Sequence, residues 1–318
     1  FGDKLPVNVK ILFEGEEEYG LDNILLLLRQ EAEELNAHAL IVMDGTNTDA
    51  HTGTLTTSTR GLVNLTVSIK ALEKPQHSGS YCVAPDPAMA LAYVINSLRY
   101  PRDIPGFMDD CEKMDPQERM LLRNASQTAE AFMKEAGVLQ GTLRGDADTS
   151  IYERIVEEPS ISIHNMNSGQ PNGGNTIQDS ASCTVGIRLT SGQIPKKVEE
   201  AVTKYIKELK DIPYGLSVDV KPDDDGCWGW KADLTKPYSQ EYLNAMKDVF
   251  GKIAARPTGG TIPMLHECRQ LLPDMEIIMP GVEDPECSAH SHNESQHKGL
   301  LLNSINSLIA FMNKVGSK

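Results

Sequence analysis

The sequence predicts an α/β domain, with a mixed sheet and flanking helices, that is interrupted by a ferredoxin-like α+β domain. Strand and helix patterns alternate near both ends of the chain, and the middle follows the order β-α-β-β-α-β once the helix expected after Asp115 is set aside. The length of 318 residues also favours two domains, because one hydrophobic core rarely serves so long a chain. We expect the α/β domain in segments 1–60 and 233–318 and the inserted domain at 61–232.

The first segment has the pattern of a βαβ unit. Its elements are an alternating strand, an amphipathic helix and a second strand, expected at 7–13, 21–35 and 39–43. The first strand runs into Glu14 and Glu16 to Glu18, and the second into Asp44. Ligands of open α/β sheets bind at the carboxyl ends of the strands, so this edge is the candidate site. A run of charges is also typical of a solvated turn.

Two changes of composition mark the inserted domain. The threonine-rich passage 46–61 ends at Gly61, where apolar residues begin to alternate as in a sheet with one covered face. The tract 221–237, which holds the chain's two tryptophans, forms the second boundary. Between them we expect a strand from Gly61, helices at 86–99 and 115–136, strands at 160–164 and 182–189, a helix at 195–209 and a strand at 216–220. After the second boundary we expect a helix at 238–250, a strand at 275–279 and a helix at 299–312.

The charge balance limits the partners of the chain. Thirty Lys and Arg stand against 45 Asp and Glu, and the net charge of −15 repels nucleic acid and anionic membranes alike. No apolar run approaches the roughly 20 residues that span a bilayer. Six cysteines are scattered without CxxC spacing, which favours free thiols in a reducing compartment, the cytoplasm.

Several residues could carry chemistry. Glu17 and Glu18 could divide into a proton carrier and a metal ligand. Asp44 could ligate a cation or cap the next turn. In the loop AHSHNESQH, either His290 or His292 could bind zinc, whereas loop histidines are otherwise surface residues.

Two further residues lie in the inserted domain. His77, in QHSGSY, has by itself the character of a surface residue. Arg188 lies in a strand among apolar neighbours, and a buried guanidinium needs an anion. A structural carboxylate and a substrate carboxylate are equally compatible with it.

The ordered set of these motifs resembles the M20 metallopeptidases, in particular their branch of cytosolic nonspecific dipeptidases and carnosinases. The matching stretches run through nearly the whole chain: FEGEEEYG, IVMD, RGLVNLTVSIKA, KPQHSGSY, PSISIHN, NTIQDSASCTVGIRL, TGGTIP and CSAHSHNES. The resemblance implies a zinc-peptidase-like catalytic domain that holds two divalent ions, zinc or else manganese or cobalt, and a lid domain that also forms a homodimer. It is specific for the family and less so for the substrate.

The resemblance also implies roles for the acidic and histidine residues. Glu17 matches the general base, which takes a proton from the attacking water and returns it to the leaving amine. Glu18 and His290 match ligands that share one ion, and Asp44 matches a ligand of the other.

In the lid and beside the site, the resemblance implies residues that hold the substrate. His77 matches a histidine that reaches the partner subunit's site and steadies the oxyanion. Asn175 and Arg188 match substrate-binding residues, with the arginine on the substrate carboxylate, and Gly260 with Thr261 matches the adjoining glycine-rich loop.

The sequence departs from the family pattern in two respects. The family's H-x-D histidine and its bridging aspartate precede the acid pair, where this chain has 16 residues and no histidine. With too few ligands for two catalytic ions, we expect the natural polypeptide to be longer and these 318 residues to be inactive for lack of two ligands. Thr258 stands where the dipeptidases have a glutamate, so the preferred substrate is expected to differ.

Three functions are compatible with the sequence. The first is a metal-dependent hydrolase that cleaves dipeptides or short peptides next to a free C-terminal carboxylate. The second is an N-acyl amino acid deacylase with the same ions and the same arginine. The third is a non-catalytic protein of this fold that acts in dimerisation or binding.

Overall fold

A computed structural model describes residues 4–18, 20–114, 116–125, 127–145, 150–169 and 174–317. The chain forms two compact units, each with its own core. Unit 1 comprises Phe1–Arg60, Lys113–Glu157 and Trp230–Lys318, and unit 2 comprises Gly61–Glu112 and Glu158–Gly229. The mixed α/β class and the inserted ferredoxin-like unit agree with the sequence prediction.

Unit 1 is built on a mixed sheet in which β12 and β3 are central. The strands are β1 (Ala39–Ile41), β2 (Gly45–Thr46), β3 (Gly53–Thr59), β10 (Trp230–Lys231), β11 (Ile253–Pro257) and β12 (Glu276–Glu283). β1 and β2 pair in parallel with β12, which is antiparallel to β3. On its other side β3 pairs in parallel with β11. β10 pairs antiparallel with the end of β3, on the side opposite to β11, since Ser58 pairs with residues of both strands.

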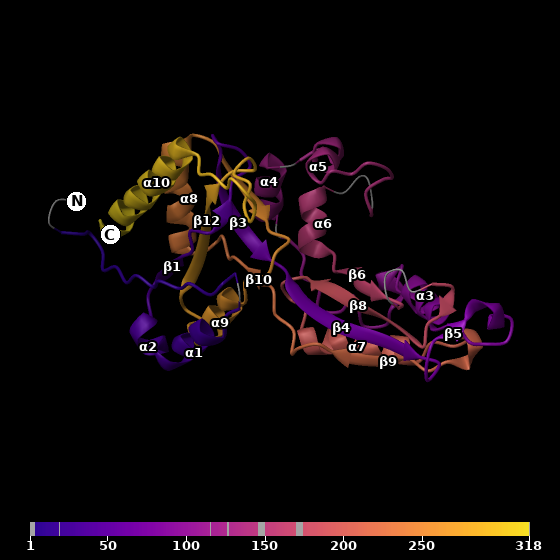
Figure 1. Cartoon of the computed structure of the whole chain (residues 1–318). Helices are drawn as coiled ribbons and strands as arrows, with labels where there is room; N and C mark the ends of the chain where they lie inside the picture. Colours follow the sequence, from indigo (N-terminus) through magenta and orange to yellow (C-terminus); the bar gives the residue numbers. More distant parts are fainter. Residues whose placement is uncertain are drawn as a thin grey trace. The chain divides into compact units, whose positions relative to one another are not determined.

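Helices cover both faces of the central strand of unit 1 (Figure 1). They are α1 (Asp22–Gln30), α2 (Ala32–Leu35), α4 (Pro116–Asn124), α5 (Ala129–Glu135), α6 (Ile151–Glu157), α8 (Pro237–Phe250), α9 (Pro263–Leu271) and α10 (Lys298–Gly316). Ile277 and Met279 of β12 pack in one core with residues of α1 and α9, whereas Ile278 packs in the other with residues of α8 and α10. Because side chains alternate along a strand, β12 is apolar on both faces.

The strand predicted at 7–13 does not form. Residues 7–13 have no regular secondary structure and pair with no strand in the part of the chain that the structure describes, and Ile11 and Phe13 are 72% and 88% exposed. An alternating pattern supplies one apolar face, but a strand also needs a neighbouring ladder. The segment is held instead by Lys10, whose ammonium donates to the carbonyl of Asn36 at 2.9 Å.

The threonine-rich passage contains the most buried strand of unit 1, β3, which the sequence prediction treated as a boundary loop. All seven residues of β3 are buried. Two of their hydroxyls have partners, since Thr54 Oγ1 accepts from the Thr48 amide at 3.1 Å and Thr59 Oγ1 from the Trp230 amide at 3.1 Å, whereas Thr57 Oγ1 is buried without one. β-Branched threonines suit a strand when their hydroxyls are bonded, so polar composition concealed a core element.

Residues 113–157 pack with unit 1, which differs from the predicted single domain at 61–232. Leu121 and Leu122 of α4 share a core cluster with Leu55, Ala254 and Ala255. The predicted helix at 115–136 is two helices, α4 and α5, and Asp115, its expected cap, lies outside the described residues. Along the chain, unit 2 begins at Gly61, and the last segment of unit 1 begins at Trp230.

Unit 2 has the predicted β-α-β-β-α-β order. Its elements are β4 (Gly61–Lys70), β5 (Gln76–His77), a 3-10 turn (Ser78–Ser80), α3 (Pro87–Ser97), a 3-10 turn (Pro101–Asp103), β6 (Ser160–Asn167), β7 (Thr176–Ile177), β8 (Ser180–Leu189), α7 (Pro195–Lys207), a 3-10 turn (Pro213–Gly215) and β9 (Asp219–Pro222). The antiparallel order β6-β8-β4-β9 is that of a ferredoxin-like sheet. α3 and α7 pack on one face of this sheet, where Leu65, Val185 and Val202 are fully buried.

The start of α3 supports a stability prediction. Asp86 has extended backbone angles, and its Oδ1 accepts from the amide of Ala88 at 2.9 Å, as an N-cap does. Asp86→Ala is expected to lower the free energy of unfolding by about 1 kcal/mol. Asp86→Asn, which keeps an acceptor oxygen, should restore most of this loss. Urea denaturation of the three proteins measures both differences, and equal losses in both variants would contradict the capping role.

The six cysteines are free thiols, of which Cys82 is exposed. This agrees with the expectation from their spacing. In the described part of the chain, no helix combines the length and the apolar character that crossing a membrane requires.

Candidate metal centre

In the acidic loop before α1, one glutamate stabilises the start of the helix and two are left for the candidate site. The carboxylate of Glu16 accepts from the amide of Asn23 at 3.2 Å, at the start of α1, and the Glu16 carbonyl accepts from the amide of Gly20 at 2.8 Å. Glu16 is therefore part of the turn that starts the helix. Glu17 and Glu18, the predicted proton carrier and ligand, are the acids that remain for the site.

Two neighbouring strand ends supply further carboxylates. Asp44 lies between β1 and β2, both of which pair with β12, and β12 ends at Glu283. The carbonyl of Glu283 accepts from the amide of Asn47 at 2.7 Å and from its side chain at 3.0 Å, which fixes the end of the strand. The sequence prediction missed Glu283 because it ended this strand at Met279. The available signal was the one used for Asp44, an acid at the end of an apolar strand.

The loop after β12 brings His290 to the acidic loop. Its chain reverses through positive φ angles at Ser288 (58°) and His290 (61°), and the amide of Ser295 donates to the carbonyl of Cys287 at 2.8 Å. His290 Nδ1 then lies 3.4 Å from Oε2 of Glu18. These two predicted ligands are thus brought together from segments more than 270 residues apart.

The electrostatics of the cluster is that of crowded negative charge. Partial burial and then the charges of Glu18 and Asp44 raise the pKa of Glu17, while His290 acts in the opposite direction. The side chain of Asp44 is accessible to solvent, yet partial desolvation by the surrounding protein raises its pKa. The negative charges of Glu283 and Glu18 raise this pKa further. A bound cation would relieve this repulsion, and a raised pKa suits a carboxylate that must carry a proton.

The pair formed by Glu18 and His290 fits one zinc ion in part. Two ligand atoms at ~2.0–2.1 Å from a tetrahedral zinc lie about 3.3 Å apart, close to the observed 3.4 Å. Among the residues that the structure describes, no three His, Cys, Asp or Glu side chains are arranged to hold a metal ion. Asp44 lies near enough to Glu18 and His290 for their charges to affect its pKa. The residues present therefore provide two adjoining ligands and a third nearby carboxylate.

The glycine-rich loop of unit 1 follows β11. The Gly260 carbonyl accepts from the amide of Arg60 at 2.8 Å, and the Gly260 amide donates to Thr258 Oγ1 at 3.2 Å. The amide of Thr258 in turn donates to the carbonyl of Ser58 in β3 at 2.9 Å. Gly260 and Thr261 thus lie in a loop anchored to the end of β3.

In unit 2, the predicted catalytic residue His77 and the predicted substrate-binding residue Asn175 lie together. His77 is part of the short ladder of β5 and β7, Asn175 precedes β7, and the amide of Ser78 donates to the carbonyl of Asn175 at 3.0 Å. His77 is exposed, and its Nδ1 accepts from the amide of Gly79 at 3.0 Å. Arg188 is half-buried in β8, and its charge acts on the thiol of Cys227.

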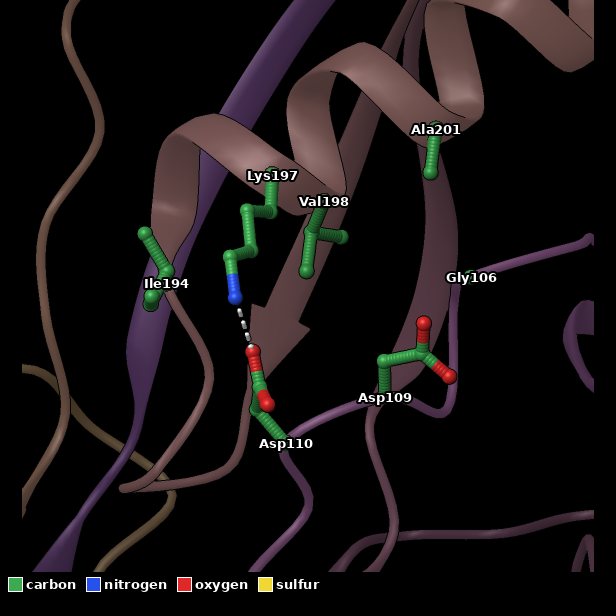
Figure 2. Close-up of a pocket in the computed structure, with 7 residues that line it drawn as sticks. All are labelled: Gly106, Asp109, Asp110, Ile194, Lys197, Val198 and Ala201. Carbon is green, nitrogen blue, oxygen red and sulfur yellow. Dashed lines mark hydrogen bonds and ion pairs between the residues drawn. The ribbon is translucent and has the colours of Figure 1, made fainter.

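Two hollows lie away from all of these residues. One, of about 350 Å³, lies in unit 2 between α7 and the loop at 106–110 (Figure 2). Its lysine, Lys197, points to Asp110 and pairs with it at 2.8 Å. The other, of about 410 Å³, lies in unit 1 around Trp230 and Glu276, and the carboxylate of Glu276 is bound by the amide of Ser239 at 2.8 Å. Lys197 and Asp110 in the first hollow and Glu276 in the second are therefore engaged within the protein.

The raised pKa of Asp44 predicts a pH-dependent stability. A folded-state pKa above the ordinary value of about 3.9 means that the folded protein holds this proton to higher pH than the unfolded chain does. The contribution of the Asp44 carboxyl to the free energy of unfolding is therefore fully present below pH ~3.9 and is lost as the pH rises through the raised pKa. In metal-free buffer, Asp44→Asn should be more stable than the wild type at pH 7, and the difference should vanish towards pH 4. Thermal denaturation across this range tests the prediction, which a difference independent of pH would refute.

Fold and site together define a two-unit α/β chain in which a ferredoxin-like unit interrupts a mixed-sheet unit with an acid- and histidine-lined sheet edge. Residues 57–212 match the peptidase dimerisation domain of the M20 family. This match and the dipeptidases among the curated relatives agree with the resemblance of the motifs.

Curated relatives match most of this chain. It is 28% identical over 299 residues to the cysteinylglycine-S-conjugate dipeptidase of Corynebacterium striatum, an alignment that covers 91% of this chain and 63% of the relative. It is 24% identical over 301 residues to the beta-Ala-His dipeptidase of Rattus norvegicus, with coverage of 91% and 60%. The chain thus spans somewhat less than two thirds of the length of these relatives.

Solved structures agree in fold. Human carnosine dipeptidase 1 superposes with a TM-score of 0.77 at 20% identity, over 99% of this chain and 67% of the other. An M20 family metallo-carboxypeptidase from Sulfolobus solfataricus gives a TM-score of 0.80 at 20% identity, over 96% and 70%. The similarity extends through both units of the chain.

Proposed function

We propose that this chain belongs to a metal-dependent hydrolase that cleaves dipeptides or short peptides next to a free C-terminal carboxylate. The observation that carries the proposal is the 3.4 Å contact of His290 with Glu18, beside Glu17 and near Asp44, at the carboxyl edge of the unit 1 sheet. The names of its relatives, which include dipeptidases and a metallo-carboxypeptidase, support the same class of substrate.

Glu18 and His290 would hold one divalent metal ion, and Asp44 would serve a second or complete the set. When bound, such ions polarise the scissile carbonyl and make water a nucleophile at neutral pH. Glu17 takes a proton from the attacking water and returns it to the leaving amine. Its half-buried position and raised pKa suit this exchange, because a carboxyl with a pKa nearer to neutral both accepts and releases a proton readily.

Unit 2 supplies the groups that recognise the substrate carboxylate. A protein with a net charge of −15 repels an anionic substrate unless a fixed cation attracts it. Arg188 provides that cation, since a guanidinium binds a carboxylate through two parallel hydrogen bonds. Asn175 binds the substrate from the same unit, and Gly260 and Thr261 line the substrate from unit 1.

The working unit in this proposal is a homodimer in which His77 completes the site of the partner. Mixing His77→Ala subunits with Glu17→Gln subunits should then create one intact site in each hybrid dimer. Random association of equal amounts makes half of the dimers hybrid, so about one quarter of the wild-type activity is expected. Each variant alone should remain inactive. Absence of recovery after verified subunit exchange would show that each site is self-contained.

The substrate class is tested with the purified product of the complete gene. Hydrolysis of free dipeptides, their C-terminal amides and N-acyl amino acids is compared in chelator and after zinc or manganese is restored. We expect metal-dependent cleavage of the free dipeptides and little cleavage of the amides. Preference for N-acyl amino acids would indicate a deacylase, and no turnover with any metal would indicate a binding protein.

A further inference from the structure

The unit 2 sheet has one face under its helices and one polar face. The core face carries alternate residues of β4 and β8, such as Leu65 and Val185. Alternation therefore places the intervening residues on the opposite face. The polar face of the three adjoining strands β6, β8 and β4 carries Ser162, His164, Thr184, Gly186, Arg188, Asn64 and Thr66.

A glycine on this face makes room for the imidazole of His164. Gly186 of β8 is opposite Ser162 of β6 and Asn64 of β4. A Cβ at Gly186 would collide with Nε2 of His164 and would meet the Asn64 Oδ1 at 3.4 Å. The ring of His164 therefore lies across Gly186, and its Nε2 is 3.0 Å from the hydroxyl of Ser162.

The backbone is shaped at this point as well. The ladder between β6 and β8 shifts register directly after His164, and Asn165 has a positive φ of 48°. The side chain of Asn165 donates to Thr184 Oγ1 at 3.4 Å. Bulges of this kind redirect a side chain, and a non-glycine residue in the left-handed region costs energy that the surrounding structure must sustain. The bulge and Gly186 together set the position of one imidazole.

Arg188 follows Gly186 on the same face of the same strand. Residues two apart in a strand are about 6.6 Å apart, so the His164 ring lies roughly one such step from the arginine. A substrate whose carboxylate is held by Arg188 places the side chain of its C-terminal residue within reach of this ring. His164 and Ser162 are both exposed on this face, so their polar atoms are accessible to a ligand.

We propose that His164 is a specificity-determining residue that hydrogen-bonds a polar side chain on the C-terminal residue of the substrate. The inference rests on the proposed function, in which Arg188 binds the carboxylate of that residue. The chemical class of substrate is a dipeptide that ends in a hydrogen-bonding side chain. Gly186 keeps the space for the imidazole, and Ser162 holds its Nε2.

The test compares two dipeptides of nearly equal shape, alanyl-asparagine and alanyl-leucine. Wild-type protein should cleave the asparagine substrate with a kcat/KM about tenfold higher, through a lower KM, because a site built for a polar group rejects the apolar isostere. His164→Ala should abolish this ratio with kcat unchanged, and His164→Gln, which keeps polar atoms, should retain part of it. Gly186→Ala, which displaces the ring, should act like His164→Ala. His51→Ala, an exposed histidine of unit 1, is the matched control and should change nothing.

The outcomes distinguish the role of His164 from the proposed hydrolase activity. Equal effects of His164→Ala on both dipeptides, or no effect on either, would overturn the assignment of His164 while leaving the hydrolase intact. Failure of wild-type protein to cleave either dipeptide would overturn the proposed function and this inference with it. Melting temperatures of all variants identify a purely structural effect, which would lower both rates together and would count against the proposal.

Discussion

Glu17→Gln is expected to lower kcat by about 10²–10⁴-fold, the usual contribution of a general acid–base residue. Glutamine has nearly the same shape but cannot carry the proton from water to the leaving amine. KM should change little, because the proposed contacts to the substrate carboxylate come from other residues. Steady-state kinetics of a free dipeptide at saturating metal measures both constants.

Glu16→Gln is the matched control for this prediction. Glu16 lies next to Glu17, but its carboxylate accepts from the amide of Asn23, and a glutamine oxygen can also accept this bond. Activity should therefore stay near that of the wild type. Equal losses in the two variants would indicate that the loop was disturbed. Loss of metal binding in Glu17→Gln would identify Glu17 as a ligand and not as a proton carrier.

The strands and helices of unit 2 were predictable because their local sequence patterns reflect which side chains are buried. β4 and β8 alternate strictly, since helices cover one face of the sheet and the other face is polar. Asp86 and Pro87 mark the start of α3 through local backbone chemistry. Such signals depend on residues that are close in sequence or on one face of a sheet. They can therefore be recognised without knowledge of the whole fold.

Unit 1 was harder to predict because its key features depend on distant segments. β3 is buried on both faces, where Asn47 and Thr48 bond to Thr54 and Trp230 bonds to Thr59, residues that a local pattern does not connect with the strand. α4 belongs to unit 1 because its leucines pack with β11, a contact that no local pattern reveals. Residues 7–13 show the reverse case, a strand pattern without a described partner.

The candidate site was predictable only in part. Acids after two apolar runs indicated Glu17, Glu18 and Asp44, although only the run before Asp44 forms a strand, whose carboxyl end lies at an edge where ligands of such sheets bind. The choice between His290 and His292 was open from the residues alone, since both lie in the same polar loop. Positive φ angles at Ser288 and His290 turn the loop so that His290 contacts Glu18. Side-chain direction in an irregular loop follows from such angles and not from composition.

This choice gives the second prediction of large effect. His290→Ala is expected to weaken binding of a divalent metal by more than about 100-fold, because loss of an outer-shell partner alone costs 10–100-fold and a direct ligand contributes more. His292→Ala, an exposed imidazole two residues away in the same loop, should bind metal like the wild type. Calorimetric titration of zinc into the apo-proteins compares them directly and does not depend on turnover. If His292→Ala lost the metal and His290→Ala kept it, the loop would bind through the other imidazole. The contact of His290 with Glu18 would then be an ordinary surface pair, and the centre would have to be assigned anew.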